Sequence, residues 1–121
     1  MNTDTARTFA QHWINSWNSH DIDEIMSHYT DEIEFHSPFI TLLKFNDTGC
    51  ITSKPELRKY FEVGLNAYPD LHFAFQRLYT GTNTLAIQYT SVNARQALEV
   101  FEFNDAGKVV KVYCNYGVDN L

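Results

Sequence analysis

The stretch Ala97-Leu98-Glu99-Val100-Phe101-Glu102-Phe103 places an acidic residue in the middle of an apolar strand. Side chains of a strand alternate between two faces, so Glu99 shares its face with Phe101 and Phe103. Two phenylalanines predict that this face looks inward. A carboxylate there must be paired, held neutral by a raised pKa, or placed against a cavity. The other interpretation is that the strand end is solvated and Glu99 points to water.

Further strands are predicted on both sides of this stretch. The segments 71–79, 85–93 and 109–116 alternate in the same way and are separated by turn residues, so the four strands form a meander. In the first of them, odd positions such as Phe73 and Phe75 are expected to share a face. A short strand is predicted at 33–37, and residues 40–52 are expected to form a loop.

Three helices are predicted from apolar residues spaced three and four apart. The first runs from about residue 3 to residue 18. The second begins at Asp21 and the third at Ser53, each with a glutamate three residues later in the spacing of a capping box. Helices followed by a run of strands predict an α+β fold, with helices on one face of an antiparallel sheet.

The length of 121 residues predicts one domain spanning residues 1–121. No stretch approaches the roughly 18 apolar residues of a membrane helix. The N-terminal residues lack a signal peptide pattern, so a cytoplasmic protein with free thiols at Cys50 and Cys114 is expected. A net charge of −6 without a basic cluster argues against nucleic acids and membranes as partners.

His36 and Ser37 lie where the 33–37 strand leaves the core. If Phe35 faces inward, Ser37 does so too and His36 faces away, as a surface histidine. An acid–base role for His36 needs a bend before Pro38 that turns its ring toward a pocket. Ser37 is not expected to be a nucleophile, because no Gly-x-Ser-x-Gly motif surrounds it.

The last strand is expected to place Val110, Val112, Cys114 and Tyr116 on the side of Glu99. Cys114 is interpreted as a small core residue, because no basic neighbour is present to form a thiolate. Aromatic residues that converge near an acid would form an apolar pocket with few polar groups. The candidate ligand-binding residues are Trp13, Trp17, Tyr29, Ser37, Phe39, Phe61, Tyr89, Phe101, Val112, Cys114 and Tyr116.

Neither a metal nor another cofactor is expected. The five histidines show no metal-ligand spacing, and the chain contains no glycine-rich phosphate loop.

Several segments occur in a characteristic order: Trp17–Asp23, Tyr29–Glu32, Phe35–Pro38, Pro69–Phe73 and Phe101–Val110. Together they resemble the SnoaL-like division of the nuclear-transport-factor-2-like superfamily, and the last is similar to the ketosteroid isomerases of that superfamily. The resemblance covers essentially the whole chain. It implies a conical, cystatin-like α+β barrel, in which three helices pack on a strongly curved sheet around a pocket. It also implies a homodimer through the outer sheet face.

The resemblance to the isomerases can be carried over residue by residue. Their acid that donates a hydrogen bond to the developing oxyanion matches Glu99. Their general-base aspartate matches Ser37, and their oxyanion tyrosine matches Trp13. The acid is therefore retained as a carboxylic acid, whereas the general base and the oxyanion tyrosine are replaced by other residue types. By this resemblance, the base would have to be His36.

The sequence therefore predicts a domain that binds a small, largely apolar molecule bearing a carbonyl or hydroxyl group. Glu99 and His36 are the candidate catalytic residues, for proton transfer of the isomerase, cyclase or dehydratase type. The alternative is a non-catalytic ligand-binding or dimerisation module, favoured by the missing base. The two hypotheses can be told apart, because only the proton-transfer enzyme requires Glu99 and His36 to face the same cavity. A homodimer is expected, with Phe73, Phe75 or their neighbours and Tyr113 on its aromatic surface.

Overall fold

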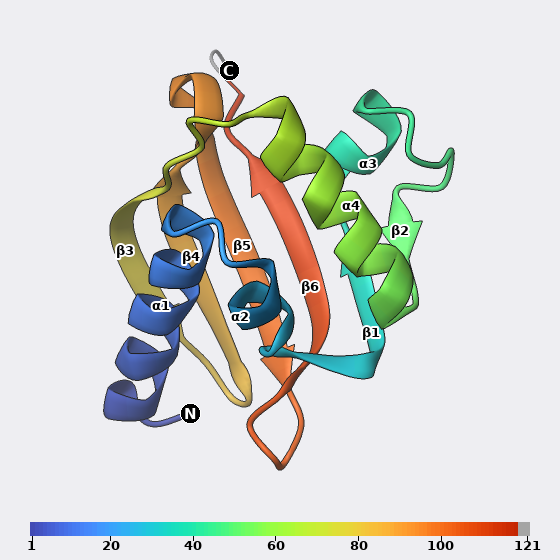
Figure 1. Ribbon diagram of the computed structural model, residues 1–121. Helices are drawn as coiled ribbons and strands as arrows, with labels where there is room; N and C mark the ends of the chain where they lie inside the picture. The colour runs from blue at the N-terminus through green and yellow to red at the C-terminus, as the bar shows by residue number, and fades with distance from the viewer. Residues whose placement is uncertain (119–121) are drawn as a thin grey trace.

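A computed structural model describes residues 1–118, in which helices cover one face of a curved six-stranded sheet (Figure 1). The helices are α1 (Thr3–Asn18), α2 (Ile22–Met26), α3 (Pro38–Leu42) and α4 (Lys54–Ala67), with a 3-10 turn η1 (Val92–Ala94). The strands are β1 (Tyr29–His36), β2 (Cys50–Ile51), β3 (Ala74–Thr80), β4 (Thr84–Thr90), β5 (Gln96–Phe103) and β6 (Val109–Tyr116). The predicted α+β fold is confirmed.

The strands follow the order β2-β1-β6-β5-β4-β3. The predicted meander is present, because β3 to β6 pair antiparallel in sequence order. β1 pairs parallel with β6, so the expectation of a wholly antiparallel sheet is wrong at this pair. A hairpin would have forced antiparallel pairing, but these two strands are joined through most of the chain and either direction is open to them.

The helix starts follow from side-chain caps. Asp21 and Ser53 accept hydrogen bonds from the backbone N–H groups of Glu24 and Glu56, as predicted. Ser37 caps the unexpected helix α3 by accepting from the N–H of Phe39. A helix of five residues is too short to show a helical period, and with β2 it occupies part of the segment expected to be a loop.

The core lies between the helices and the concave face of the sheet. Trp13 and Ile25 contribute to it from the helices, and Ile87, Phe101 and Val112 contribute from the strands. The three predicted apolar helix stripes therefore face the sheet, as their spacing indicated.

Irregular pairing changes which residues face outward. Phe73 is buried, and Phe75 pairs with the buried Tyr89 and lies on the helix side, so neither belongs to the outer surface on which it was expected. A register shift between Phe75 and Arg77 turns Tyr79 outward instead. A second shift, between Glu102 and Phe103, lets Val109 turn into the core, although it was expected on the opposite face. Such bulges break the period of two on which the prediction rested.

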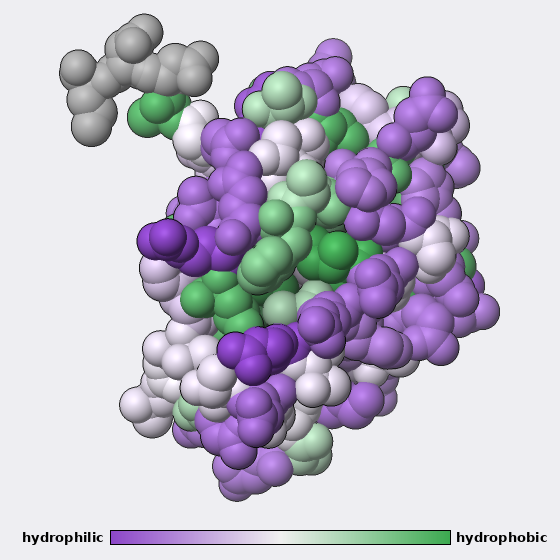
Figure 2. Space-filling view, turned by 90° about the vertical axis from the view of Figure 1, so that its left-hand side faces the viewer, coloured by the Kyte–Doolittle hydropathy of each residue, from purple (hydrophilic) through white to green (hydrophobic). Residues whose placement is uncertain are grey.

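Two surfaces of the molecule carry apolar groups. On the outer face, Tyr79, Val100 and Tyr113 lie in one row of paired residues across β3 to β6. At the sheet edge, a groove between α1 and β3 includes Ala10 and Leu78, and Figure 2 shows apolar surface in a hollow on this side.

No helix among the described residues is long and apolar enough to cross a membrane. Cys50 and Cys114 are free cysteines, as expected.

Candidate functional site

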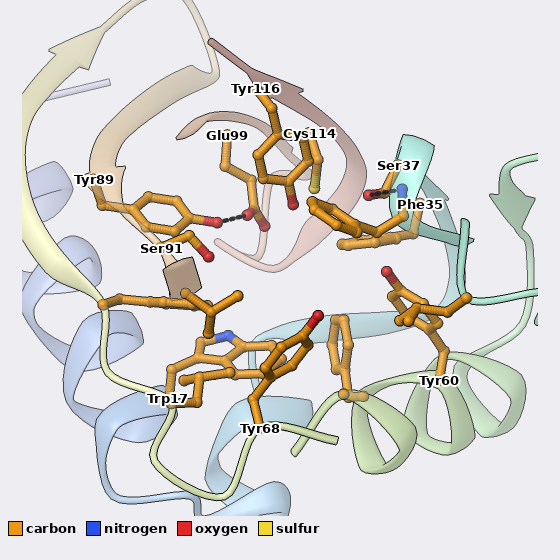
Figure 3. A pocket seen from close by; sticks show the side chains of 17 residues that line it. Trp17, Phe35, Ser37, Tyr60, Tyr68, Tyr89, Ser91, Glu99, Cys114 and Tyr116 are labelled. Atoms are coloured by element: carbon orange, nitrogen blue, oxygen red, sulfur yellow. Dashed lines mark hydrogen bonds between the residues drawn. The ribbon is translucent and has the colours of Figure 1, made fainter. Parts of the chain in front are cut away.

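An apolar cavity of about 90 Å³ lies between the helices and the sheet. Its wall combines side chains from α1, α3, α4 and the strands, and Figure 3 shows them converging around a common space. Eight of the predicted site residues line it: Trp17, Ser37, Phe39, Phe61, Tyr89, Glu99, Cys114 and Tyr116.

Four other predicted residues, Trp13, Tyr29, Phe101 and Val112, are buried in the core and do not line the cavity. The Trp13 ring stacks on Phe73 with centroids 5.7 Å apart, and its indole N–H donates to the Tyr29 hydroxyl over 3.1 Å. The helix stripe that sequence analysis identified is therefore divided. Its Trp13 end packs against the sheet, and its Trp17 end reaches the cavity.

His36 lies outside the cavity, on the outer face of the sheet. Its ring stacks on Tyr113 with centroids 4.8 Å apart, and its Nε2 lies 3.1 Å from Glu34 Oε2. β1 stays extended to its last residue, so alternation turns Ser37 inward and His36 outward. Glu99 and His36 do not face the same cavity, and the expected acid–base pair is not assembled.

Glu99 is only 4% exposed, although it is a carboxylic acid. The Tyr89 hydroxyl donates a hydrogen bond to its Oε1 over 2.7 Å. Burial raises the pKa of Glu99 to about 7, against the opposing effect of hydrogen bonds from Tyr89 and Cys114. Near neutral pH this carboxyl group therefore exists in both its protonated and its ionised form.

The other polar groups of the wall are uncharged. Figure 3 shows the hydroxyl groups of Tyr60, Tyr68 and Tyr116 turned toward the cavity. Burial raises the pKa of Tyr60 and Tyr116 far above neutrality, and burial together with the Glu99 charge does the same for Cys114. No lysine, arginine or histidine is among the lining residues of the described chain.

Sequence analysis missed part of the wall. Tyr60 lies on the apolar stripe of α4 and Tyr68 continues this stripe at the C-cap, so the helical spacing was the signal that could have identified both. Ser91 follows Tyr89 by two residues in the alternating segment 85–93, so alternation could have identified it, whereas Val92 begins the short turn η1, for which the sequence held no periodic signal. Within the described residues, no cluster of three or more side chains could hold a metal ion.

Comparison with known proteins identifies the family. Residues 10–112 match the SnoaL-like domain, so the chain belongs to the family of SnoaL-like domains. No curated protein matches the chain.

Solved structures share the fold. A SnoaL-like protein of unknown function from Burkholderia thailandensis is 36% identical, with a TM-score of 0.92 over 98% of this chain and 99% of the other. An NTF2-like protein of unknown function from Cytophaga hutchinsonii is 10% identical, with a TM-score of 0.72 over 93% and 89%. The epoxide hydrolase/cyclase-like enzyme SalBIII is 16% identical, with a TM-score of 0.76 over 96% and 93%. At the lower identities the likeness concerns the fold alone.

Proposed function

We propose that this protein binds a small, largely apolar molecule in the cavity and that Glu99 is its polar anchor. The observation that supports this most is a buried carboxyl group in the wall of an apolar cavity that no cationic side chain lines. Burying a carboxyl group costs folding free energy unless a hydrogen-bonding partner compensates for the lost contact with water. A ligand oxygen or hydroxyl group would be such a partner.

The hydrogen bond from Tyr89 determines which part of the carboxyl group is available. Because Tyr89 donates to Oε1, we take Oε2 of Glu99 as the oxygen that a ligand would meet, beside the Cys114 thiol that also hydrogen-bonds to this carboxyl group. In the protonated form Oε2 donates to a carbonyl or hydroxyl oxygen, and in the ionised form it accepts from a hydroxyl group. Both kinds of ligand match the chemistry of the site.

The size of the cavity limits the ligand. A cavity of roughly 150 Å³ holds a benzene molecule, and the present cavity of about 90 Å³ is smaller. A molecule of a few heavy atoms fits without rearrangement. A larger one requires the partly buried side chains of Phe39, Leu43 or Tyr68 to move outward.

A second candidate function is proton transfer on the bound molecule, as in an isomerase, cyclase or dehydratase. The observation in its favour is the pKa of about 7 at Glu99, because a general acid–base is most effective when its pKa is near the operating pH. With His36 outside the cavity, Glu99 would have to take and return the proton alone. Covalent catalysis by Cys114 is disfavoured, since its raised pKa leaves little thiolate.

Binding can be tested with cyclobutanone, a small ketone, by ligand-observed NMR. We expect binding to the wild type, weaker binding to Glu99→Gln and none to Glu99→Leu. Glu102→Leu is the matched control, because Glu102 lies on the same strand with its side chain exposed. The proposal fails if the wild type does not bind, or if Glu99→Leu and Glu102→Leu bind alike.

A further inference from the structure

A groove of about 790 Å³ lies between α1 and β3, on the side of the molecule that Figure 2 shows. Its lining includes the apolar side chains of Ala10, Ile14, Phe75 and Leu78. Phe75 is 50% exposed on the helix side of the sheet, although it is a large apolar residue. None of the described residues that line this groove also lines the cavity around Glu99, so the groove is a separate candidate site.

The backbone of β3 offers hydrogen-bonding groups along this groove. β3 is the last strand of the sheet and pairs only with β4. At the hairpin the N–H of Gly81 donates to the Thr84 carbonyl oxygen over 2.9 Å, and the backbone groups of successive residues in a strand point to opposite edges. Counted back from Gly81, the N–H and C=O groups of Thr80 and Leu78 therefore point to the free edge. Among the described residues, no other strand or side chain hydrogen-bonds to these groups.

A neighbouring residue shows what satisfies this edge where α1 covers it. Just before β3, the side-chain amide of Asn18 accepts from the Phe73 N–H over 2.7 Å and donates to the Phe73 carbonyl oxygen over 3.0 Å. The amide group thus takes the place of an adjacent strand at Phe73. At Leu78 and Thr80 this place is open, and a peptide backbone carries the same donor and acceptor as the Asn18 amide.

The charge of the groove is opposite to that of the whole protein. Arg7 and Arg77 line it, and its described lining residues include no aspartate or glutamate, whereas the net charge of the chain is −6. Arg7 Nη1 lies 3.7 Å from Asp4 Oδ1, an exposed ion pair that is weak in water. Arg77 has no ion pair within the described residues. A partner that carries carboxylates therefore complements the groove.

We propose that the groove binds an extended acidic peptide segment of a partner protein, which adds to β3 as a further strand. Its backbone pairs with Leu78 and Thr80, and one of its apolar side chains packs on Phe75. Flanking carboxylates approach Arg7 and Arg77. Strand addition takes its affinity from main-chain hydrogen bonds and its specificity from alternate side chains. The interaction goes beyond the proposed function, because it does not involve the cavity.

The test uses the peptide acetyl-Glu-Thr-Val-Thr-Val-Thr-Asp-amide, in which acids flank two alternating valines. Amide hydrogen exchange of the full chain, measured by NMR, is the readout. We expect the amide protons of Leu78 and Thr80 to exchange rapidly in the free protein and to become protected when the peptide binds. The Tyr79 amide faces β4 and should be protected in both states. A peptide that does not bind at millimolar concentration, or that binds without protecting Leu78 and Thr80, would overturn the proposal.

N-methylation of the peptide distinguishes strand pairing from binding through side chains alone. Two copies are methylated at alternate amide nitrogens, each copy on one edge of the extended peptide. Only the copy whose methyl groups face β3 should lose binding, because it has lost the donors that this edge requires. Equal affinities of the two copies would contradict strand addition.

Arg77→Gln tests the contribution of charge. The affinity for the peptide should fall roughly two- to fivefold, and the difference from the wild type should shrink as the salt concentration rises. Arg58→Gln is the matched control, because Arg58 lies on α4 and does not line the groove. Equal effects of the two variants would overturn the charge complementarity on which the proposal rests.

The protein without the peptide shows whether the occupant is instead a second copy of this chain. In that case the Leu78 and Thr80 amides would become protected as the protein concentration rises, and the peptide proposal would be overturned. We expect the exchange of both amides to be independent of protein concentration.

Discussion

The Tyr89 hydroxyl on β4 lies 2.7 Å from Glu99 Oε1 on β5, and both side chains are buried. The two residues are diagonal neighbours, because Tyr89 pairs with Ala97 and Glu99 pairs with Ile87. Diagonal neighbours on one sheet face lie within reach of long side chains. The regular pairing of two strands therefore sets the orientation of the carboxyl group in the cavity.

This contact leads to a prediction for Tyr89→Phe. The hydrogen bond from Tyr89 lowers the Glu99 pKa, in opposition to burial. Its loss should therefore raise the pKa further above 7 and destabilise the fold by about 1 kcal/mol. Carbon NMR of the carboxyl group and urea denaturation measure the two effects. A fall of the pKa toward ordinary glutamate values would contradict the expected role of this bond.

The raised pKa of Glu99 also predicts a pH dependence of stability. Between the ordinary value of 4.5 and the folded value of about 7, the folded state binds the proton and the unfolded state does not. The stability that protonation of Glu99 adds to the folded state is complete below pH 4.5 and is lost as the pH rises through 7. This shift of the Glu99 pKa corresponds to about 3 kcal/mol in the free energy of unfolding. Urea denaturation from pH 5 to 8 should show this loss in the wild type but not in Glu99→Gln.

His28 should contribute in the opposite direction. Its Nδ1 lies 2.9 Å from the Ile25 carbonyl oxygen and must carry the proton, so its Nε2 accepts from His12 Nδ1 over 2.9 Å. Burial lowers the pKa of His28 below 6.5. As the pH falls below 6.5, the unfolded state gains a proton first and the fold loses stability. We expect His28→Gln to lose this destabilisation at low pH. Urea denaturation of the wild type and of His28→Gln at a series of pH values measures the difference.

We propose that the protein is a homodimer through the outer face of the sheet. Tyr79, Leu98 and Tyr113 expose apolar surface on this face, and such a surface favours association. Light scattering at micromolar concentration should give the mass of a dimer, and Leu98→Asp should shift it toward a monomer. Leu42→Asp is the control, because Leu42 is exposed but belongs to the short helix α3 rather than to a strand of the sheet. A monomeric wild type, or equal effects of the two variants, would refute the proposal.

Much of the fold could be predicted because local signals and packing agree. The bounds of α1 and the starts of α2 and α4 follow from apolar spacing and from capping residues such as Asp21 and Ser53. The parallel pairing of β1 and β6 joins distant segments, and no local pattern encodes it. The bulge after Phe75 depends on pairing with β4, so alternation alone could not show that Phe75 lies on the helix side of the sheet and Tyr79 on the outer side.

The candidate site was predicted where a side chain followed the strand period. Alternation placed Glu99, Cys114 and Tyr116 on the cavity side, and it also turned His36 outward, because β1 pairs regularly with β6 from Glu34 to His36. Two tryptophans on one stripe look equivalent in sequence. Only the packing of the folded chain shows that Trp13 is buried against the sheet and that Trp17 lines the cavity.

The titration of the Glu99 carboxyl group by carbon NMR in the free protein tests the central claim most directly. We expect a midpoint near 7, because burial in the cavity wall disfavours the charged form. Glu102, exposed on the same strand, provides an internal reference in the same spectrum. A Glu99 midpoint near the ordinary value of about 4.3 would mean a solvated acid, and it would contradict the role of Glu99 as a buried ligand anchor.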